Sequence, residues 1–447
     1  MDTGDVIATV LVALLLVALH KPPPAWLKAV HPVSPDGPAR EERSDMPSNS
    51  KPRPARGVRT RAVHGVHAVS PGPVSTPIIH SATFSFPSLA AMDAEQERGA
   101  AGAYYQRVGH PTLHACELRL AGLEGAETAL LFSSGVAALA GMFLAHLKAG
   151  DHIIALHQCY GGTHDLLRWG ADHFGWSFDL ADARDPSGWE RLFRRETRLF
   201  HIESPTNPTL CVVDIQRASA LAHAHGALLT VDNTFASPIG QKPLALGADL
   251  SMYSATKSIG GHGDLLAGVV LGRTAQLREV LHARKVFGPV PDPALAWQIE
   301  RSLKTLPLRV AATNASALEL ATRLAGHPSV AQVFYPGLPS HPGHEIARRQ
   351  MMLGFGPVLA FEVPGGAEAA IETVNRLELV AHAPSLGSVA SLASLPAWTS
   401  HIGLGVEGRR LAGIPEGLVR LSVGLEEVED LWADLERALA GARILQP

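Results

Sequence analysis

The stretch best suited to chemistry is a lysine flanked by hydroxyl residues and glycines. Within Asp249–Val270 an apolar segment runs into Ser254 and Thr256, then Lys257, then glycines on both sides of a histidine. Burial or cationic neighbours lower the pKa of a lysine from about 10.4, so part of the amine is unprotonated at neutral pH. Such an amine condenses with aldehydes, and the obvious aldehyde cofactor is pyridoxal phosphate, whose phosphate the hydroxyls could bind. From this motif alone, a surface lysine beside a flexible loop is the better supported alternative.

Other chemically suited residues follow apolar segments of the chain. Gly135 and Val136 open a helix pattern, where backbone amides favour an anion such as a phosphate. Tyr160, Asn207 and Asp232 each come after a later apolar segment. Taken singly, these residues have ordinary explanations as a helix cap, an interfacial tyrosine or turn residues.

Two C-terminal residues are candidates for binding a substrate. Arg420 lies inside the apolar run Leu-Val-Arg-Leu-Ser-Val, and Ser385 precedes Leu-Gly. A buried arginine needs an anionic partner, and its guanidinium can hold a carboxylate through two bonds. The alternative for Arg420 is a strand arginine paired with another side chain.

The elements that must position these residues alternate between strands and helices. Alternation of this kind predicts a mostly parallel sheet with helices on both faces and ligands at the carboxyl ends of the strands. The expected strands are Thr128–Phe132, His152–Leu156, Leu199–Ile202, Ala227–Val231, Leu250–Tyr253 and Ala267–Leu271.

A second, smaller domain follows a long helical segment, Trp297–Ala325. Its closing helix has one apolar face, because Val428, Leu431, Leu435 and Leu439 repeat at helical spacing. We therefore expect an α/β large domain with a smaller C-terminal α+β domain. The strands expected in the smaller domain are Val330–Tyr335, Val358–Val363, Leu377–Ala381 and Leu418–Val423.

Composition narrows the class of protein. The chain has 447 residues, 46% hydrophobic and 18% charged, as in globular enzymes. Lys and Arg number 38 against 42 Asp and Glu, which does not favour nucleic-acid binding. The three cysteines, Cys116, Cys159 and Cys211, lack metal-type spacing. We expect no metal site, no disulfide framework and a reducing, cytoplasmic location.

The N-terminal segment differs in composition from the rest. Val6–Leu19 is a 14-residue, mostly apolar run, short of the roughly 20 residues that cross a bilayer, and it follows acidic residues. A Pro-, Ser- and Arg-rich stretch leads to Met46, where we expect translation to begin. A membrane anchor is the alternative, so membrane attachment is not the favoured interpretation.

Taken together, the motifs resemble a known family. The pattern Asp-Leu-x-x-x-Ser-Ala-Thr-Lys-x-Ile-x-Gly-His-Gly around Lys257 is similar to the cofactor-lysine signature of the Cys/Met-metabolism (trans-sulfuration) family of pyridoxal-phosphate enzymes. This family includes cystathionine synthases, cystathionine lyases and methionine gamma-lyase. Matching stretches continue in the family's order from about Thr60, although Ser258 departs from the usual aromatic residue or glutamine. The resemblance implies a fold-type I pyridoxal-phosphate transferase.

The resemblance also implies roles for the candidate residues. Lys257 binds the cofactor, Tyr160 stacks on its ring and assists proton transfer, and Asn207 bonds its phenolic oxygen. Asp232 keeps the ring nitrogen protonated, and Arg420, with Ser385, holds the substrate carboxylate.

In this family the N-terminal arm reaches a neighbouring subunit. Tyr105 and Arg107 match a tyrosine and an arginine that bind the phosphate of the partner's cofactor. The resemblance therefore implies a homo-oligomer, a dimer or a dimer of dimers. His110 stands where an asparagine is usual.

Three positions leave the reaction open. Asp165 and Ala390 replace an arginine and a glutamate common in cystathionine-type enzymes, and Gly162 replaces the cysteine of methionine gamma-lyase. We expect elimination or replacement at the beta or gamma carbon of a sulfur-containing amino acid. One alternative is cystathionine gamma-synthase-like replacement on an O-acylhomoserine. Another is a non-catalytic, cofactor-binding or membrane-tethered interaction protein.

The predicted division of the chain has four parts. Residues 1–59 form an extension, 60–106 the arm, 107–305 the cofactor-binding domain and 306–447 the small domain.

Overall fold

The computed structural model describes residues 56–65 and 73–442. The apolar run Val6–Leu19 and the expected start at Met46 lie outside the described residues, so the interpretations attached to them stay predictions.

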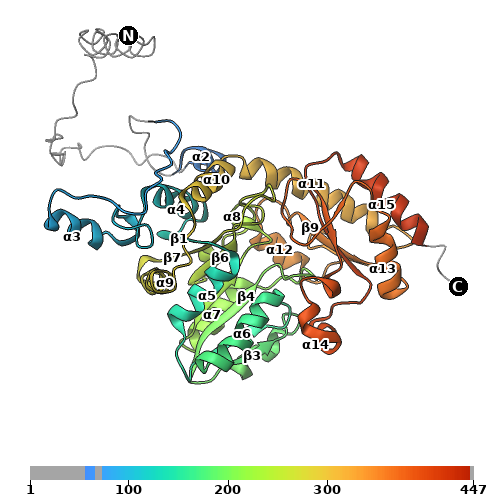
Figure 1. Ribbon diagram of the computed structural model, residues 1–447. Helices are drawn as coiled ribbons and strands as arrows, with labels where there is room; N and C mark the ends of the chain where they lie inside the picture. Colours follow the sequence, from blue (N-terminus) through green and yellow to red (C-terminus); the bar gives the residue numbers. More distant parts are fainter. Residues whose placement is uncertain (1–55, 66–72, 443–447) are drawn as a thin grey trace, which may run out of the picture. The chain divides into compact units, whose positions relative to one another are not determined.

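The larger sheet has seven strands in the order β1-β7-β6-β5-β4-β2-β3 (Figure 1). Its strands run parallel except β7, which is antiparallel to both neighbours. The predicted mostly parallel sheet is thus confirmed. The strands are β1 (Thr128–Phe132), β2 (His152–Leu156), β3 (Ser177–Ala181), β4 (Thr197–Glu203), β5 (Leu228–Asp232), β6 (Leu250–Ser254) and β7 (Gly268–Gly272).

One strand of this sheet, β3, was not predicted. It forms an edge of the sheet and pairs with β2. Ser177 and Asp179 interrupt its apolar residues, and most of the strand is only half-buried. An edge strand of this kind gives no continuous apolar run in the sequence.

Helices cover both faces of the larger sheet. Successive strand side chains point to opposite faces, so Tyr253 of β6 packs in one core with Leu120, while Met252 packs in another with Met142. The first face carries α4 (Pro111–Glu124), α7 (Ile215–Ala224) and α10 (Pro293–Leu303), and the second carries α5 (Gly135–His146), α6 (Gly161–Phe174) and α9 (Thr274–Phe287).

A second, five-stranded sheet has the order β10-β11-β12-β9-β8. Helices α11 (Leu306–Ala325), α13 (Gly366–Asn375) and α15 (Val428–Ala442) pack in its core. In Figure 1 these C-terminal elements, gold to red, lie together around β9. Its strands are β8 (Gln332–Phe334), β9 (Val358–Glu362), β10 (Ala381–His382), β11 (Leu392–Ser394) and β12 (Leu418–Ser422).

The smaller unit differs from expectation in detail. The strand expected at 377–381 is reduced to β10, and β11 was not predicted because three residues give no period. The helical segment 297–325 is split at Lys304 and Thr305, because Pro307 can occupy only the first turn of a helix. The remaining helices are α2 (Val58–His64), α3 (Leu89–Glu97), α8 (Ser237–Gly240), α12 (His344–Gln350) and α14 (Gly405–Ala412).

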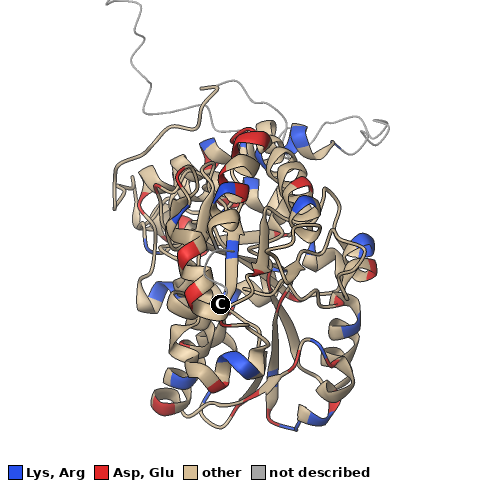
Figure 2. Ribbon diagram, turned by 90° about the vertical axis from the view of Figure 1, so that its right-hand side faces the viewer, with Lys and Arg blue, Asp and Glu red and all other residues tan. Residues whose placement is uncertain are grey.

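The distribution of charged residues and the lengths of the helices bear on nucleic-acid and membrane partners. Figure 2 shows basic and acidic residues interspersed over the side that it presents. Among residues 56–65 and 73–442, no helix combines the length and apolar character that a bilayer crossing requires.

A buried ion pair joins α9 to α4 and β1. Arg284 Nη1 donates to Glu117 Oε1 at 2.7 Å and to the Leu131 carbonyl at 2.8 Å, while Leu131 N donates to Glu117 Oε1 at 2.9 Å. Both charged side chains are buried. Removal of the cation would leave a buried carboxylate without its partner.

We predict that Arg284→Met destabilises the protein by about 3–5 kcal/mol, the usual cost of removing one partner of a buried pair. Thermal and urea unfolding with saturating cofactor measure this loss. Arg410→Met, which breaks an exposed pair with Glu407, is the matched control and should leave the melting temperature almost unchanged. Equal shifts in the two variants would contradict the prediction.

Candidate active site

Ten of the twelve predicted site residues converge on one cavity. The carboxyl ends of parallel strands meet at the same edge of a sheet, and the residues that follow β1, β4, β5 and β6 meet there. The cavity has a volume of about 620 Å³. Its lining includes Gly135, Val136, Tyr160, Asn207, Asp232, Ser254, Thr256, Lys257, Ser385 and Arg420.

Lys257 follows β6 and points its amine at Ser385, in the loop after β10. Lys257 Nζ donates to Ser385 Oγ at 2.6 Å. Burial and the positive charge of Arg420 lower the pKa of Lys257 to about 8, although Asp232 acts to raise it. Ser385 has a φ of 89°, a left-handed conformation that is strained for a serine. The strained backbone thus belongs to the residue that holds the reactive amine.

Arg420 contacts loops that follow strands of both sheets. It lies on the central strand β12, where it is only 3% exposed. Its Nη1 donates to Asn207 Oδ1 and its Nη2 to the Ser385 carbonyl, both at 2.9 Å. Burial lowers the pKa of Arg420 to about 10, so the guanidinium keeps its charge. These neutral partners fix its orientation and leave its charge for an anion.

Asp232, at the end of β5, is a buried carboxylate that suits a cationic ring nitrogen. It accepts a hydrogen bond from Thr234 N at 3.0 Å and, within the described residues, forms no ion pair closer than 4.0 Å. Burial raises the pKa of Asp232, while Thr234 and Lys257 act to lower it. A buried carboxylate without a cation is costly, and a protonated ring nitrogen would supply that cation.

The N-terminus of α5 forms a cradle at another part of the cavity. Ser134 caps this helix by accepting from Ala137 N at 3.0 Å, so the amides of Gly135 and Val136 precede the first helical bonds. A Cβ at Gly135 would lie 2.8 Å from Ser254 Cβ, so only glycine fits there. Amides and a nearby hydroxyl suit a phosphate group.

The hydroxyl of Thr256 is hydrogen-bonded to the backbone of Ala267. Thr256 Oγ1 donates to the Ala267 carbonyl at 3.2 Å and accepts from Ala267 N at 3.1 Å. These bonds hold the loop that carries Lys257 against β7. Taken with Asp232 and Lys257, the cradle gives this cavity the groups that pyridoxal phosphate requires.

Glu203 is a wall residue to which the sequence assigned no role. Its two carboxylate oxygens accept from Tyr160 N at 2.9 Å and from Asn207 N at 2.7 Å. Burial and the charge of Asp232 raise the pKa of Glu203 well above its usual range, while these amides and Arg420 lower it. Glu203 therefore fixes two loops that the cavity needs. In the sequence Glu203 directly precedes Ser204-Pro205, and this position alone indicated no role.

Tyr105 and Arg107 lie outside the lining of this cavity. Arg107 is exposed, and its Nη1 donates to the Lys285 carbonyl at 2.9 Å. Its guanidinium lies 5.4 Å from the centre of the Tyr105 ring, which is 42% exposed. Nearby His110 caps α4 by accepting from Thr112 N, which is the role an asparagine can also play.

None of the three departures from the family pattern, Gly162, Asp165 and Ala390, is among the residues that line the cavity. Asp165 is exposed and pairs with Arg168. Gly162 lies under the Tyr160 ring, where a Cβ would approach a ring carbon at 2.5 Å.

Comparison with known proteins gives a consistent result. The family described as Cys/Met metabolism PLP-dependent enzyme matches residues 59–440. O-succinylhomoserine sulfhydrylase of Pseudomonas aeruginosa is 42% identical over 76% of this chain and 84% of its own. Chloroplastic cystathionine gamma-synthase 1 of Arabidopsis thaliana is 41% identical over 82% of this chain, which spans 65% of that relative.

A solved structure shares the fold. Cystathionine gamma-lyase from Lactobacillus plantarum, complexed with L-serine, aligns with a TM-score of 0.81 and 37% identity over 87% of this chain and 100% of its own. The expected α/β architecture is thereby confirmed.

The low pKa of Lys257 makes cofactor binding depend on pH. The amine must lose its proton before it can attack an aldehyde, so the rate of pyridoxal phosphate uptake should rise with pH and level off above about 8. Asp232→Asn removes a negative charge that raises this pKa, so the midpoint should move to lower pH.

Stopped-flow absorbance of the bound cofactor, at saturating concentration, measures this midpoint. Lys257→Ala is the control and should show no aldimine band beyond the absorbance of free cofactor. A midpoint near the ordinary lysine value of about 10.4 in both the wild type and Asp232→Asn would contradict the assignment.

Proposed function

Since the chain belongs to the Cys/Met metabolism family of pyridoxal-phosphate-dependent enzymes, we propose that it catalyses elimination or replacement at the beta or gamma carbon of a sulfur-containing amino acid. The observation that carries this proposal is the contact of Lys257 Nζ with Ser385 Oγ, beside Arg420 and in the same cavity as Asp232. An amine, a carboxylate anchor and a buried carboxylate are the groups that such a reaction needs.

Each of these residues has a defined task in the proposal. The bound cofactor supplies an electron sink for the carbon next to the amino group. Arg420 binds the substrate carboxylate with its charged fork, which Asn207 and Ser385 already orient. Lys257 Nζ, with its pKa of about 8, takes the proton from the alpha carbon of the substrate. It then returns the proton towards the beta or gamma carbon of the substrate side chain, from which the leaving group departs.

Tyr160 and the phosphate cradle complete the assignment. Tyr160 is held through its backbone by Glu203, is 40% exposed as a residue and lines the cavity, and we assign its hydroxyl to the leaving group. Gly135, Val136 and Ser254 bind the phosphate, and Thr256 holds the loop that carries Lys257.

The lining of the cavity bears on the class of substrate. Among the described residues that line it, Arg420 is the only arginine. One anchor supports a substrate with a single amino-acid head, such as methionine, cysteine or homocysteine, over cystathionine, which has two. Replacement on an O-acylhomoserine remains the second candidate, because relatives named as synthase and sulfhydrylase are 41% and 42% identical.

We also propose that the active site is shared between subunits. Arg107 is exposed outside its own cavity and has only a backbone carbonyl and the Tyr105 ring as described partners. Val74 and Ile78, in the arm before it, are exposed apolar residues, as expected of a segment covered by a partner. A dimer or a dimer of dimers, with Arg107 and Tyr105 at the partner's phosphate, accounts for both features.

The remaining proposals concern location and organisation. Cys116, Cys159 and Cys211 are unpaired, which supports a reducing, cytoplasmic location. We propose the boundaries 107–305 and 306–447 for the cofactor-binding and small domains, with 60–106 as the arm and 1–59 as an extension.

A substrate panel tests the reaction. We expect keto acid and thiol from methionine, cysteine or homocysteine at higher kcat/KM than from cystathionine. Arg420→Lys should lower kcat/KM by roughly 10- to 100-fold, because a bond to a charged group contributes about 1.5–3 kcal/mol. Arg410→Lys, on an exposed pair, is the control. Activity confined to O-acylhomoserines with a thiol acceptor would favour replacement, and no turnover of any compound would reject the proposal.

Mixing two inactive variants tests the shared site. Arg107→Ala and Lys257→Ala, dissociated and reassembled at equal concentration, should regain roughly a quarter of wild-type activity. Random pairing makes about half of the dimers hybrids, and each hybrid has one site with both residues intact. Proven hybrids without activity would show that Arg107 does not serve the partner.

A further inference from the structure

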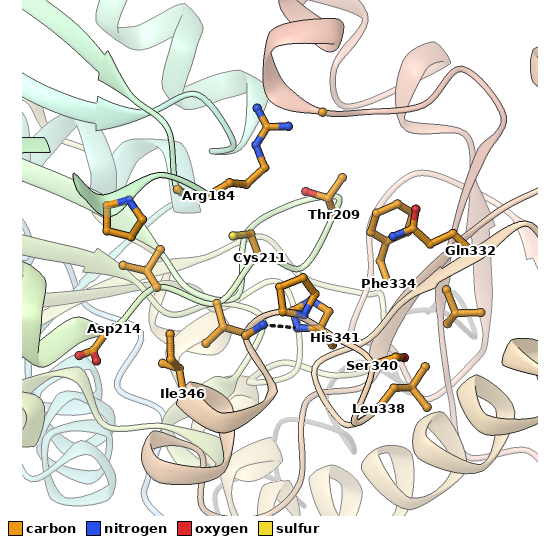
Figure 3. A pocket seen from close by; sticks show the side chains of 18 of the residues that line it. Arg184, Thr209, Cys211, Asp214, Gln332, Phe334, Leu338, Ser340, His341 and Ile346 are labelled. Atoms are coloured by element: carbon orange, nitrogen blue, oxygen red, sulfur yellow. Dashed lines mark hydrogen bonds between the residues drawn. The ribbon is translucent and has the colours of Figure 1, made fainter. Parts of the chain in front are cut away.

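A second cavity lies behind one wall of the active site. It has a volume of about 880 Å³ and is bounded by residues that follow β3 and β4 of the larger sheet and by β8 of the smaller one. Figure 3 shows Arg184, Cys211, Phe334 and His341 around the same hollow. None of its lining residues belongs to the lining of the active-site cavity.

The charges around this cavity do not balance. Arg184 is paired with Asp182 at 2.7 Å, and the carboxylate of Asp214 is paired with Arg349 at 3.1 Å. Arg217 also lines the cavity, and its only hydrogen bond from the side chain to a described residue is to the Pro186 carbonyl at 3.3 Å. Within the described part, Arg217 therefore has no carboxylate partner, and the cavity has an excess positive charge.

Arg184, which also lines the cavity, is fixed by hydrogen bonds. Its Nε and Nη2 bond to Asp182, and Nη2 also donates to the Leu411 carbonyl at 2.9 Å. Gly413 allows this position, because a Cβ there would overlap the guanidinium. Nη1 keeps its hydrogen atoms free of described acceptors, so a fixed donor edge remains available.

The rest of the lining is apolar or weakly polar. Phe334, Val212 and Ile346 contribute hydrocarbon, and Thr209 adds a hydroxyl with no described partner. Burial lowers the pKa of His341 to about 4, and its Nδ1 accepts from Gly343 N at 3.0 Å. His341 is therefore neutral, and its Nδ1 already accepts a hydrogen bond from Gly343. It does not alter the charge balance of the cavity.

We propose that this cavity binds a small organic anion, a carboxylate or sulfonate with a flat apolar body, between Arg184, Arg217 and Phe334. Guanidinium groups recognise the anionic head, and the hydrocarbon walls bury the body.

The two cavities share a wall, which couples the second site to the first. Thr206 N donates to the Cys211 carbonyl at 2.9 Å, and Cys211 N donates to Thr206 Oγ1 at 3.0 Å, so residues 206–211 form one closed loop. Asn207 on this loop orients Arg420, whereas Thr209 and Cys211 line the second cavity. A ligand that packs against them stabilises the loop and should lower the substrate KM, while kcat stays unchanged.

Cys211 reports on the site without any assay of activity. Cys116 and Cys159 are buried, whereas Cys211 is partly exposed to the cavity. Burial raises the pKa of Cys211 to about 11, so iodoacetamide should label it slowly in the holoenzyme at mildly alkaline pH, and peptide mass mapping follows the rate over hours. The probe is 8-anilinonaphthalene-1-sulfonate. At ten times its Kd it should slow labelling about tenfold, because only probe-free protein reacts.

Matched variants distinguish the contribution of the Arg217 charge to probe binding from that of the cavity itself. Arg217→Gln should weaken the probe about tenfold, whereas Arg195→Gln, which removes an exposed charge outside the cavity, should leave its affinity unchanged. Ser340→Trp, at an exposed position on the rim, should fill the cavity and abolish protection. Equal binding of the uncharged N-phenyl-1-naphthylamine, or an equal effect of the two arginine variants, would overturn the anion site.

The expected effect of the second cavity on the substrate KM rests on the proposed function. It is tested separately from binding of the anion. The probe should lower the substrate KM by about fivefold or more in the wild type and have no effect in Ser340→Trp. An unchanged KM in protein whose Cys211 is protected overturns the coupling. Absence of turnover with protection retained contradicts the proposed function and leaves the anion site standing.

Discussion

The active site depends on holding two cations and two carboxylates together away from water. Lys257, Arg420, Glu203 and Asp232 lie around one cavity, and burial shifts the pKa of each toward its uncharged form. Taking charges out of water costs several kcal/mol per ion unless they are paired or hydrogen-bonded. The fold meets this requirement unevenly. Arg420 and Glu203 have hydrogen-bond partners that fix them, whereas Asp232 keeps a carboxylate without a described cation. That imbalance is what makes the cavity suited to a cationic ring.

Sequence patterns predicted the residues proposed to bind ligands better than those that support them. Lys257, Asn207 and Arg420 were found because their neighbours follow a recognisable order, and strand ends brought them together as expected. Glu203 was missed as a functional residue because its role depends on joining the nearby amide of Asn207 to that of Tyr160, which is 43 residues away. No local pattern records such a pairing. The same holds for the left-handed backbone of Ser385.

The fold was predictable where strands are buried on both sides and less so at the edges. The central strands of the larger sheet give continuous apolar runs, and their positions match within about two residues. The edge strand β3 and the short strands β10 and β11 lack this signal, because few of their residues face a core. The break between α10 and α11 could have been placed at Pro307, since a proline fits only the first turn of a helix.

The loop at residues 206–211 shows how one short segment can serve two purposes. Its polar residue Asn207 must face Arg420, and the same closed turn then directs Thr209 and Cys211 to the opposite side. The loop also lies where the two sheets meet, because Arg420 comes from β12 and Phe334 from β8 of the smaller sheet. Any shift of the smaller sheet against the larger one would therefore move Arg420 and Phe334, on the two sides of this loop, together. Substrate binding at Arg420 and ligand binding beside Phe334 would then favour or oppose the same displacement, which is the physical requirement for coupling between two sites.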